Sequence, residues 1–409
     1  MGFSPMHLDA KDMGETPMLR KSPMRILMTA DTVGGVWTYS LDLARALAPY
    51  GVEIHLATMG APLSADQWED VWCAANVTVH ESHYKLEWMD QPWDDVHDAG
   101  IWLRGLQDRV QPDLVHLNGY AHGALAWDVP TVMVAHSCVC SWWEAVKRER
   151  APQSWDCYRR HVTRGLKHSD LVIAPSGAML QAIQTHYGPL RRTQVIHNGR
   201  DQSLYRPQAK APFILTAGRL WDEAKNIALL ERIAPTLHWP VCVAGDCSDP
   251  DGRTRPASNM ISLGKLSATA LAGEMSRAAI YALPARYEPF GLSALEAALS
   301  GCALVLGDIR SLREVWSTAA VFVNPSDHHE LAYSIEELIR NPARRHAMAA
   351  RAQSRASTYT HERMGRAYVT CYEQLLSQTN PVASAVGRDA LQALPSDLST
   401  ANFQLIGES

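Results

Sequence analysis

Short apolar segments rich in β-branched residues alternate with amphipathic helical patterns along most of this chain, and this rhythm constrains the fold more than any other feature. Each apolar segment ends in small or polar residues, and a stretch such as TYSLDLARALAPYG (38–51), closed by Gly51, follows with helical spacing. Near-continuous apolar strands that alternate with helices are typical of a parallel sheet covered on both faces. The sequence therefore predicts the α/β class. The predicted strands of the first half lie at 25–31, 53–59, 77–82, 114–119, 131–137, 171–176 and 194–199.

The rhythm is interrupted by a connector with Pro and charged residues, NGRDQSLYRPQAKAP (198–212), and then restarts. We therefore predict two doubly wound, Rossmann-like domains in tandem, 24–205 and 206–357, that face each other across a cleft. The start, 1–23, is polar and lacks the apolar core of a signal peptide, which predicts a flexible leader. The end, 379–409, is small and polar, which predicts a flexible tail. The predicted strands of the second half lie at 213–220, 241–246, 260–266, 280–285, 303–308 and 320–325.

Composition narrows the function classes. The 409 residues are 46% hydrophobic and 20% charged, as in a globular protein, and the net charge of -5 argues against wholesale nucleic-acid binding. No apolar run approaches the roughly 20 residues of a membrane-spanning helix. The eight Cys residues are scattered, and only Cys138 and Cys140 are close, without a second pair at zinc-site spacing. These features predict buried free thiols and a cytoplasmic protein without nucleic-acid partners.

Two loops at predicted strand ends suit an anionic ligand, because ligands of such sheets bind at the carboxyl ends of the strands. Gly34 and Gly35 follow the first strand and would let backbone N–H groups approach an anion at a helix start, although a glycine turn for chain reversal explains them equally. The loop lacks the G-x-G-x-x-G and P-loop patterns. Arg219 and Lys225 follow the first strand of the second half and form a pair suited to a diphosphate. The alternative is a solvated loop whose cations are balanced by nearby acids.

Two further loops carry candidate sugar-binding residues. Glu288 follows the strand at 280–285, with Pro289 predicted in the first turn of a helix that carries Glu296. The eight residues span up to ~12 Å, about the reach from a sugar across a diphosphate to a ribose. The N–H groups of Phe290, Gly291 and Leu292 are unpaired at the predicted helix start. The alternative is an acid that stabilises a helix dipole plus a surface Glu. His136 lies just past the strand at 131–137, where a structural and a catalytic His are both open interpretations.

Taken together, these motifs resemble those of retaining glycosyltransferases of family 4, which have the GT-B fold. The resemblance runs from Met24 to about Gln378. Its most specific part is EPFGLSALEAALSG (288–301), which matches the E-x7-E signature of the family, and the run 263–291 leads into it. Supporting segments occur in the expected order: GGV at 34–36, VIHNGRD at 195–201, and the Gly-Arg…Lys motif at 218–225.

The resemblance implies a role for each candidate residue. Glu288 would face the donor sugar, and Glu296 would accept from the ribose hydroxyls. Arg219 and Lys225 would hold the diphosphate and stabilise it as it leaves. Gly35 would touch a phosphate by its backbone when the cleft closes, and His136 would contact the sugar ring. The domain 24–205, to which the helix at about 358–378 would return, would bind the acceptor. The domain 206–357 would bind the nucleotide-sugar donor.

Two departures from the family pattern stand out. Arg219 and Lys225 are six residues apart, one more than is usual, which puts the reach of Lys225 in question. Arg200 stands where a small apolar residue is usual, and both a specificity feature and a surface residue are open interpretations.

The resemblance implies an enzyme that moves a sugar from a nucleotide-diphosphate sugar to a hydroxyl acceptor, which is a glycan, a lipid-linked molecule or a small molecule. It implies front-face attack with retention, in which the leaving phosphate oxygen takes the proton of the acceptor. A GT-B nucleotide-sugar epimerase and a non-catalytic nucleotide-sugar-binding protein are the alternatives. We expect no metal and no cofactor, because Arg219, Lys225 and the helix start at 290–292 supply positive charge. The literal D-x-D, Asp249 to Asp251, is interpreted as a turn.

A basic stretch with tryptophans, SWWEAVKRERAPQSWDCYRRHVTRGLKH (141–168), leaves a peripheral contact with the inner face of an anionic membrane open. The favoured interpretation is a solvated helix face with core tryptophans, because acidic residues interrupt the positive charge.

Overall fold

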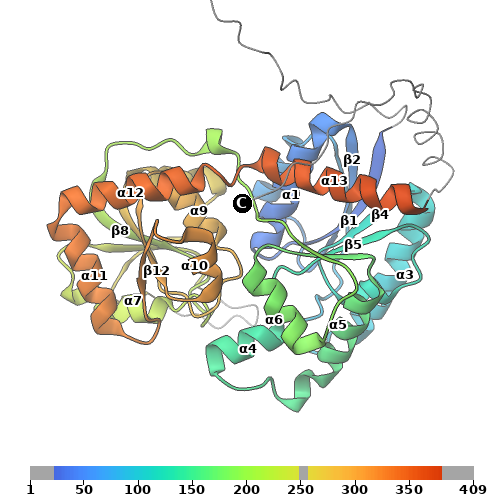
Figure 1. Ribbon diagram of the computed structural model, residues 1–409, viewed down its shortest axis with the longest axis horizontal. Coiled ribbons are helices and arrows are strands. Elements are labelled where there is room, and N and C mark those ends of the chain that lie inside the picture. Colours follow the sequence, from blue (N-terminus) through green and yellow to red (C-terminus); the bar gives the residue numbers. More distant parts are fainter. Residues whose placement is uncertain (1–22, 248–256, 380–409) are drawn as a thin grey trace, which may run out of the picture.

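The computed structural model describes residues 23–247 and 257–379, and these residues form two parallel sheets in two domains (Figure 1). Within them, the first sheet has seven strands in the order β3-β2-β1-β4-β5-β6-β7, and the second has six in the order β10-β9-β8-β11-β12-β13. In each sheet the chain moves outward in one direction, returns to the centre and continues on the other side, so each is doubly wound. The predicted fold class is confirmed.

The strands of the first sheet are β1 (Met24–Asp31), β2 (Val52–Met59), β3 (Val77–Glu81), β4 (Leu114–Leu117), β5 (Thr131–Val134), β6 (Leu171–Ala174) and β7 (Thr193–Val195). Those of the second are β8 (Ala211–Ala217), β9 (Val241–Ala244), β10 (Ile261–Gly264), β11 (Ala278–Leu283), β12 (Ala303–Gly307) and β13 (Val321–Val323). The helices are α1 (Gly35–Leu47), α2 (Ala65–Trp72), α3 (Trp93–Val110), α4 (Val139–Lys147), α5 (Asp156–His168), α6 (Gly177–Tyr187), α7 (Ile227–Ile233), α8 (Ala268–Arg277), α9 (Leu292–Leu299), α10 (Arg310–Trp316), α11 (His328–Arg340), α12 (Pro342–Ala356) and α13 (His361–Thr379).

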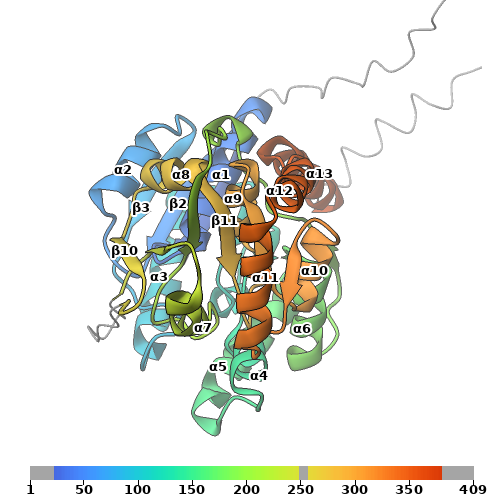
Figure 2. The same ribbon diagram turned by 90° about the vertical axis from the view of Figure 1, so that its left-hand side faces the viewer.

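Alternating side chains of the central strands enter two different cores, as a sheet covered on both faces requires. In β11, Tyr281 and Leu283 pack with α8, α9 and α10, whereas Ile280 and Ala282 pack with α7 and α11. Figure 2, which looks onto the second domain, shows α7, α11 and α8 around β11. All six residues of β11 are buried, and its side chains are apolar on both faces because helices cover both faces of the sheet.

Details of two helix ends differ from the sequence-based expectation. Gly51 does adopt a left-handed conformation (φ 68°), but it closes a short 3₁₀ turn (Ala48–Tyr50) that follows α1. The prediction that Pro289 lies in the first turn of a helix is wrong, because α9 begins at Leu292 after Gly291 (φ 91°). The left-handed Gly291 sets the start of the helix, and Pro289 belongs to the loop before it.

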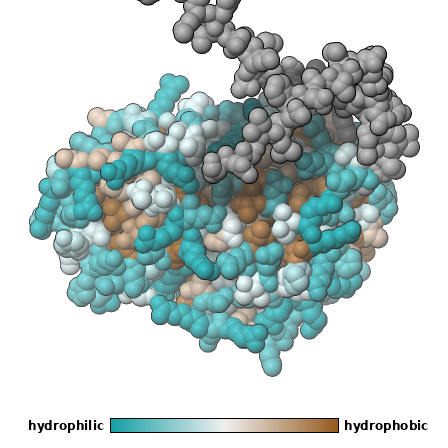
Figure 3. All heavy atoms as spheres, in the orientation of Figure 1, coloured by the Kyte–Doolittle hydropathy of each residue, from teal (hydrophilic) through white to brown (hydrophobic). Residues whose placement is uncertain are grey.

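The basic stretch with tryptophans at 141–168 forms most of α4, all of α5 and the segment between them. In the described part of the chain, no helix is long and apolar enough to cross a membrane. Trp143 and Trp155 pack against the core of the first domain beneath α4 and α5. On the face shown in Figure 3, hydrophilic residues surround smaller areas of apolar ones. The eight cysteines are free, and five of them, including Cys138 and Cys140, are buried.

The chain crosses between the domains twice, and the two crossings lie against each other. The Arg200 N–H donates to the Tyr359 carbonyl (3.1 Å), and the His361 N–H donates to the Arg200 carbonyl (3.3 Å). A Cβ on Gly199 would lie 2.1 Å from the Thr360 carbonyl oxygen, so only glycine permits this approach. After the second crossing, α13 packs on α1 and returns Tyr368 and Tyr372 to the core of the first domain (Figure 1).

A buried arginine at this crossing joins the two domains electrostatically. Arg200 is only 4% exposed, so its interpretation as a surface residue is wrong. Its guanidinium pairs with Asp42 on α1 of the first domain and, at 3.1 Å from Nε to Oε1, with Glu296 on α9 of the second. It also donates from Nε to the Tyr205 hydroxyl at 2.9 Å. One positive charge therefore serves two carboxylates, one from each domain.

Replacing Arg200 tests this junction. Arg200→Met should lower the free energy of unfolding at pH 7 by about 3–5 kcal/mol, because it leaves Asp42 and Glu296 buried without a counter-charge. Urea denaturation measures the loss. The matched control is Arg277→Met, whose Arg is 54% exposed and paired with Glu274 on one turn of α8, and it should change stability by less than about 0.5 kcal/mol.

The pH dependence separates lost charge pairing from lost packing. The destabilisation by Arg200→Met should shrink as the pH falls toward 4, where the unpaired carboxyl groups protonate. A loss that is constant with pH, or below 1 kcal/mol at pH 7, contradicts the interpretation.

Candidate active site

The loops at the carboxyl ends of β1, β5, β8 and β11 meet between the domains. Gly34 and Gly35, at the start of α1, lie opposite the second domain. A Cβ built on Gly34 would be 3.6 Å from an Arg219 terminal nitrogen, and one on Gly35 would be 3.7 Å from a Leu292 methyl carbon. The structure thus brings the glycine turn of the first domain against the cationic loop and the α9 start of the second.

Lys225 reaches the centre of this site despite its unusual spacing from Arg219. Its Nζ lies 2.5 Å from Oε2 of Glu288. The loop from Arg219 to Lys225 makes two successive tight turns. The Arg219 carbonyl accepts from the Asp222 N–H (3.2 Å), and the Asp222 carbonyl accepts from the Lys225 N–H (3.0 Å). Lys225 and Glu288 therefore form a direct ion pair at this site.

Glu288 is held by a second contact. Its Oε1 accepts from the Gly291 N–H at 3.0 Å. This interaction occupies one of the N–H groups that we predicted for a ligand at the start of α9. Phe290 is 2% exposed and packs its ring against Tyr359, so its side chain is structural and only its backbone is left for a ligand role. Glu288 is therefore oriented between a cation and a helix start.

Arg219 is positioned by its own loop. Its guanidinium pairs with Asp222 at 2.8 Å and lies 4.9 Å from the ring centroid of Trp221. Burial alone would raise the pKa of Asp222, but the charges of Arg219 and Lys225 outweigh burial and lower this pKa. Asp222 therefore stays ionised and fixes the arginine that faces Gly34.

Glu296 lies in the second turn of α9 with its side chain 12% exposed. Burial raises its pKa, although the Arg200 charge and a hydrogen bond with Tyr205 oppose this rise. Oε1 is already engaged by Arg200, so a ribose would meet a carboxylate that the domain junction holds in place.

His136 is a neutral imidazole, and its two ring nitrogens have different hydrogen-bonding roles. Burial and the neighbouring His116 lower its pKa to about 3. Its Nε2 lies 2.8 Å from the Asn118 side-chain oxygen, which accepts a hydrogen bond, and its ring packs edge-on against Tyr39 at 4.4 Å. Nε2 therefore carries the proton, and Nδ1 keeps a lone pair that can accept from a hydroxyl group.

Sequence reasoning missed three polar groups of the cleft. Asp31 ends β1 beside Arg219, and burial raises its pKa to about 7. Glu87 accepts from the Tyr120 and Ala121 N–H groups, and burial also raises its pKa to about 7. Tyr287 reaches from the loop after β11 to the first domain, where its hydroxyl lies 2.8 Å from Ser141 Oγ. Asp31 and Tyr287 lie close in sequence to predicted site residues, whereas no sequence motif around Glu87 marks it as a site residue.

No group of three or more His, Cys, Asp or Glu in residues 23–247 and 257–379 could hold a metal ion. The D-x-D at Asp249 and Asp251 lies outside the described residues.

Asp31 predicts a specific pH dependence of stability. Because its pKa is higher in the folded than in the unfolded protein, the folded state binds more protons between about pH 4 and pH 7, and Asp31 costs stability progressively as the pH rises through this window. Asp31→Asn keeps an oxygen to accept from the Val33 N–H and should stabilise the protein by about 1–3 kcal/mol at pH 8. The gain should vanish near pH 4, and urea titrations at both pH values measure it. A gain that is equal at both pH values shows that charge is not the cause.

Known families and relatives match most of the chain. The family model described as Glycosyltransferase Family 4 matches residues 33–204, and the model described as Glycosyl transferases group 1 matches residues 202–355. Glycogen synthase of Mycobacterium tuberculosis is 32% identical over 381 residues, which cover 80% of this chain and 89% of that protein. D-inositol 3-phosphate glycosyltransferase of Frankia alni is 25% identical over 425 residues, covering 90% of this chain and 100% of that protein.

Solved structures share the two-domain architecture. Sucrose-phosphate synthase from Thermosynechococcus elongatus superposes with a TM-score of 0.72 at 18% identity, covering 87% of this chain and 100% of that one. HepE from Anabaena, solved in complex with UDP-glucose, superposes with a TM-score of 0.69 at 20% identity, covering 86% and 100%. The chain therefore has the GT-B fold, and it belongs to the glycosyltransferases that join a family 4 domain to a group 1 domain.

Proposed function

We propose that this glycosyltransferase moves a sugar from a nucleoside-diphosphate sugar to a hydroxyl group with retention of configuration at the anomeric carbon. The observation that carries the proposal is the convergence of Arg219, Lys225 and Glu288 opposite Gly34. Two fixed cations suit a diphosphate, and a carboxylate beside them suits the hydroxyls of the sugar attached to it. The names of the relatives make a glucan the first acceptor to test and an inositol phosphate the second.

The diphosphate would be stabilised by groups that are already oriented. As the bond between the anomeric carbon and the phosphate oxygen breaks, negative charge builds on the leaving diphosphate. Arg219 is held by Asp222 and Lys225 by Glu288, so both cations meet this charge with little reorganisation. Positive charge of the protein thus takes the role that a divalent metal plays in other enzymes, and we propose that catalysis needs none.

Front-face attack fits the state of the carboxylates. Glu288 is engaged by Lys225 and the Gly291 N–H, and Glu296 is engaged by Arg200, so neither is a free nucleophile for a two-step displacement. The acceptor oxygen would form its bond to the anomeric carbon on the face that the diphosphate leaves. Its proton would pass to the leaving phosphate oxygen. The neutral His136 would accept from a sugar hydroxyl through Nδ1 and contribute no charge of its own.

Two glutamate variants test the division of roles. Glu288→Gln should lower kcat more than it weakens donor binding, because Glu288 lies at the reacting sugar and orients Lys225. Glu296→Gln should mainly raise the KM for the donor, by about 10- to 100-fold, because it weakens a hydrogen bond to the ribose. Steady-state kinetics over a panel of nucleotide sugars gives both numbers. Identical behaviour of the two variants would refute the assignment.

The charge of Arg219 gives a second test. Arg219→Ala should cost about 2–4 kcal/mol of transition-state stabilisation, or roughly 30- to 1000-fold in kcat/KM. Arg277→Ala, on the surface of α8, is the control and should keep wild-type kinetics. Wild-type activity should survive EDTA. Loss of activity on chelation with recovery on adding Mn²⁺ would assign the charge neutralisation to a metal instead.

The donor panel also separates the alternative functions. A transferase releases nucleoside diphosphate faster when an acceptor is present. An epimerase converts one nucleotide sugar into another without an acceptor, and a binding protein does neither.

A further inference from the structure

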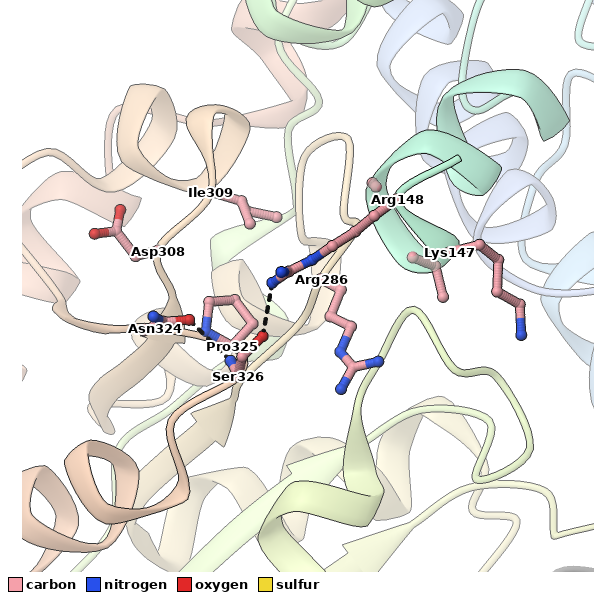
Figure 4. Close-up of a pocket in the computed structure, with 10 residues that line it drawn as sticks. Lys147, Arg148, Arg286, Asp308, Ile309, Asn324, Pro325 and Ser326 are labelled. Carbon is pink, nitrogen blue, oxygen red and sulfur yellow. Dashed lines mark hydrogen bonds between the residues drawn. The ribbon is translucent and has the colours of Figure 1, made fainter. Parts of the chain in front are cut away.

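A second pocket lies at the domain junction (Figure 4). The end of α4 in the first domain supplies Lys147 and Arg148, and the loops after β11, β12 and β13 in the second supply Arg286, Asp308 and Asn324 to Ser326. Its volume is about 630 Å³, within the usual range of small-molecule sites. None of the residues predicted to bind the donor lines it.

Two guanidinium groups of this pocket have no carboxylate partner among the described residues. Arg148 donates to the neutral Ser326 hydroxyl at 2.9 Å (Figure 4). The buried Nε of Arg286 has no hydrogen-bond partner in the described part of the chain. The acid of the pocket, Asp308, is already held by Arg313 through both oxygens at 2.5 and 2.7 Å. Lys147 pairs with Glu223 at 2.7 Å. The pocket therefore carries uncompensated positive charge.

The backbone at Arg148 is unfavourable for a side chain. Its φ of 59° is left-handed, at the position after a helix where glycine is usual. In Figure 4 the side chain crosses the pocket from α4 toward Ser326 of the other domain. Because Arg148 adopts this conformation, its guanidinium lies between the two domains, where it can bind a ligand that contacts both of them.

We propose that this pocket binds a sugar phosphate, with the phosphate on Arg148 and Arg286. A guanidinium presents paired donors that match phosphate oxygens. Asn324 and Ser326 offer polar partners for sugar hydroxyls, and Val146, Ile309 and Pro325 provide an apolar wall. Because the walls come from both domains, the bound molecule favours the arrangement in which the domains approach each other. The inference does not rest on the proposed transfer reaction, because none of the residues proposed to bind the donor lines this pocket.

The pocket is separate from the proposed donor site. Tyr287 lies between Arg286 and Glu288 in the chain, and its hydroxyl contacts Ser137, Ser141 and the Cys138 N–H of the first domain. This bridge ties the loop to the first domain between the donor-side carboxylate and the arginine of the pocket. Removing an arginine on the donor side should leave the pocket intact.

Calorimetric titration of the full-length protein with glucose 1-phosphate tests the proposal. Wild type should bind it, bind inorganic phosphate at least 10-fold more weakly, and not bind glucose. Arg286→Gln and Arg148→Gly should each weaken binding at least 10-fold. Arg148→Gly should also raise the melting temperature, because glycine adopts the left-handed conformation without strain, so lost binding cannot be ascribed to unfolding. Arg219→Ala, the matched control, should retain wild-type affinity.

Three results would overturn the proposal. They are no binding to wild type at about 10 mM ligand, unchanged affinity in both pocket variants, or loss of binding in Arg219→Ala, which would place the ligand in the donor site. Inorganic phosphate binding as tightly as glucose 1-phosphate would reduce the pocket to a simple anion site and contradict the sugar assignment.

Discussion

Both domains present the carboxyl edge of a parallel sheet to the same cleft, and the candidate chemistry depends on this constraint. A strand that is buried on both faces has no room for polar side chains, so these gather in the loops just beyond its carboxyl end. The turn after β1 and the loops after β5, β8 and β11 therefore meet, although Gly34 and Glu288 are far apart in sequence. The donor site that we propose is therefore complete only when the two edges face each other.

Charge in the cleft is balanced in pairs. Arg219 pairs with Asp222, Lys225 with Glu288, and Arg200 with both Asp42 and Glu296. Each pair lowers the cost of burying its members and fixes their orientation. An anionic donor would enter a site whose cations are already held by acids. The exception is the second pocket, where Arg148 and Arg286 pair with no acid among the residues that the structure describes.

Arg200 connects the site to the fold. The family that the chain resembles usually has a small apolar residue at this position, and here a buried guanidinium takes its place. It lies at the double chain crossing and holds the carboxylate proposed for the ribose. A change in the relative position of the domains would alter the Asp42 side of this cluster and thereby the surroundings of Glu296. Tyr287 forms a second link, from the loop of Glu288 to the first domain.

The sequence by itself determined the α/β class, the two doubly wound domains and the loops that carry the site, because strand burial and helix periodicity are local patterns and strand ends mark the loops. It also indicated Arg219, Lys225 and Glu288 as candidate residues of one site, through two separate motifs that the family resemblance joined. The tertiary structure alone decided that Lys225 reaches Glu288, through two successive turns between Arg219 and Lys225. It decided that Arg200 is buried between two carboxylates, that burial raises the pKa values of Asp31 and Glu87 to about 7, and that Arg148 and Arg286 line one pocket. Each of these depends on contacts between residues distant in the chain, and burial and charge pairing at such contacts are not encoded in local sequence.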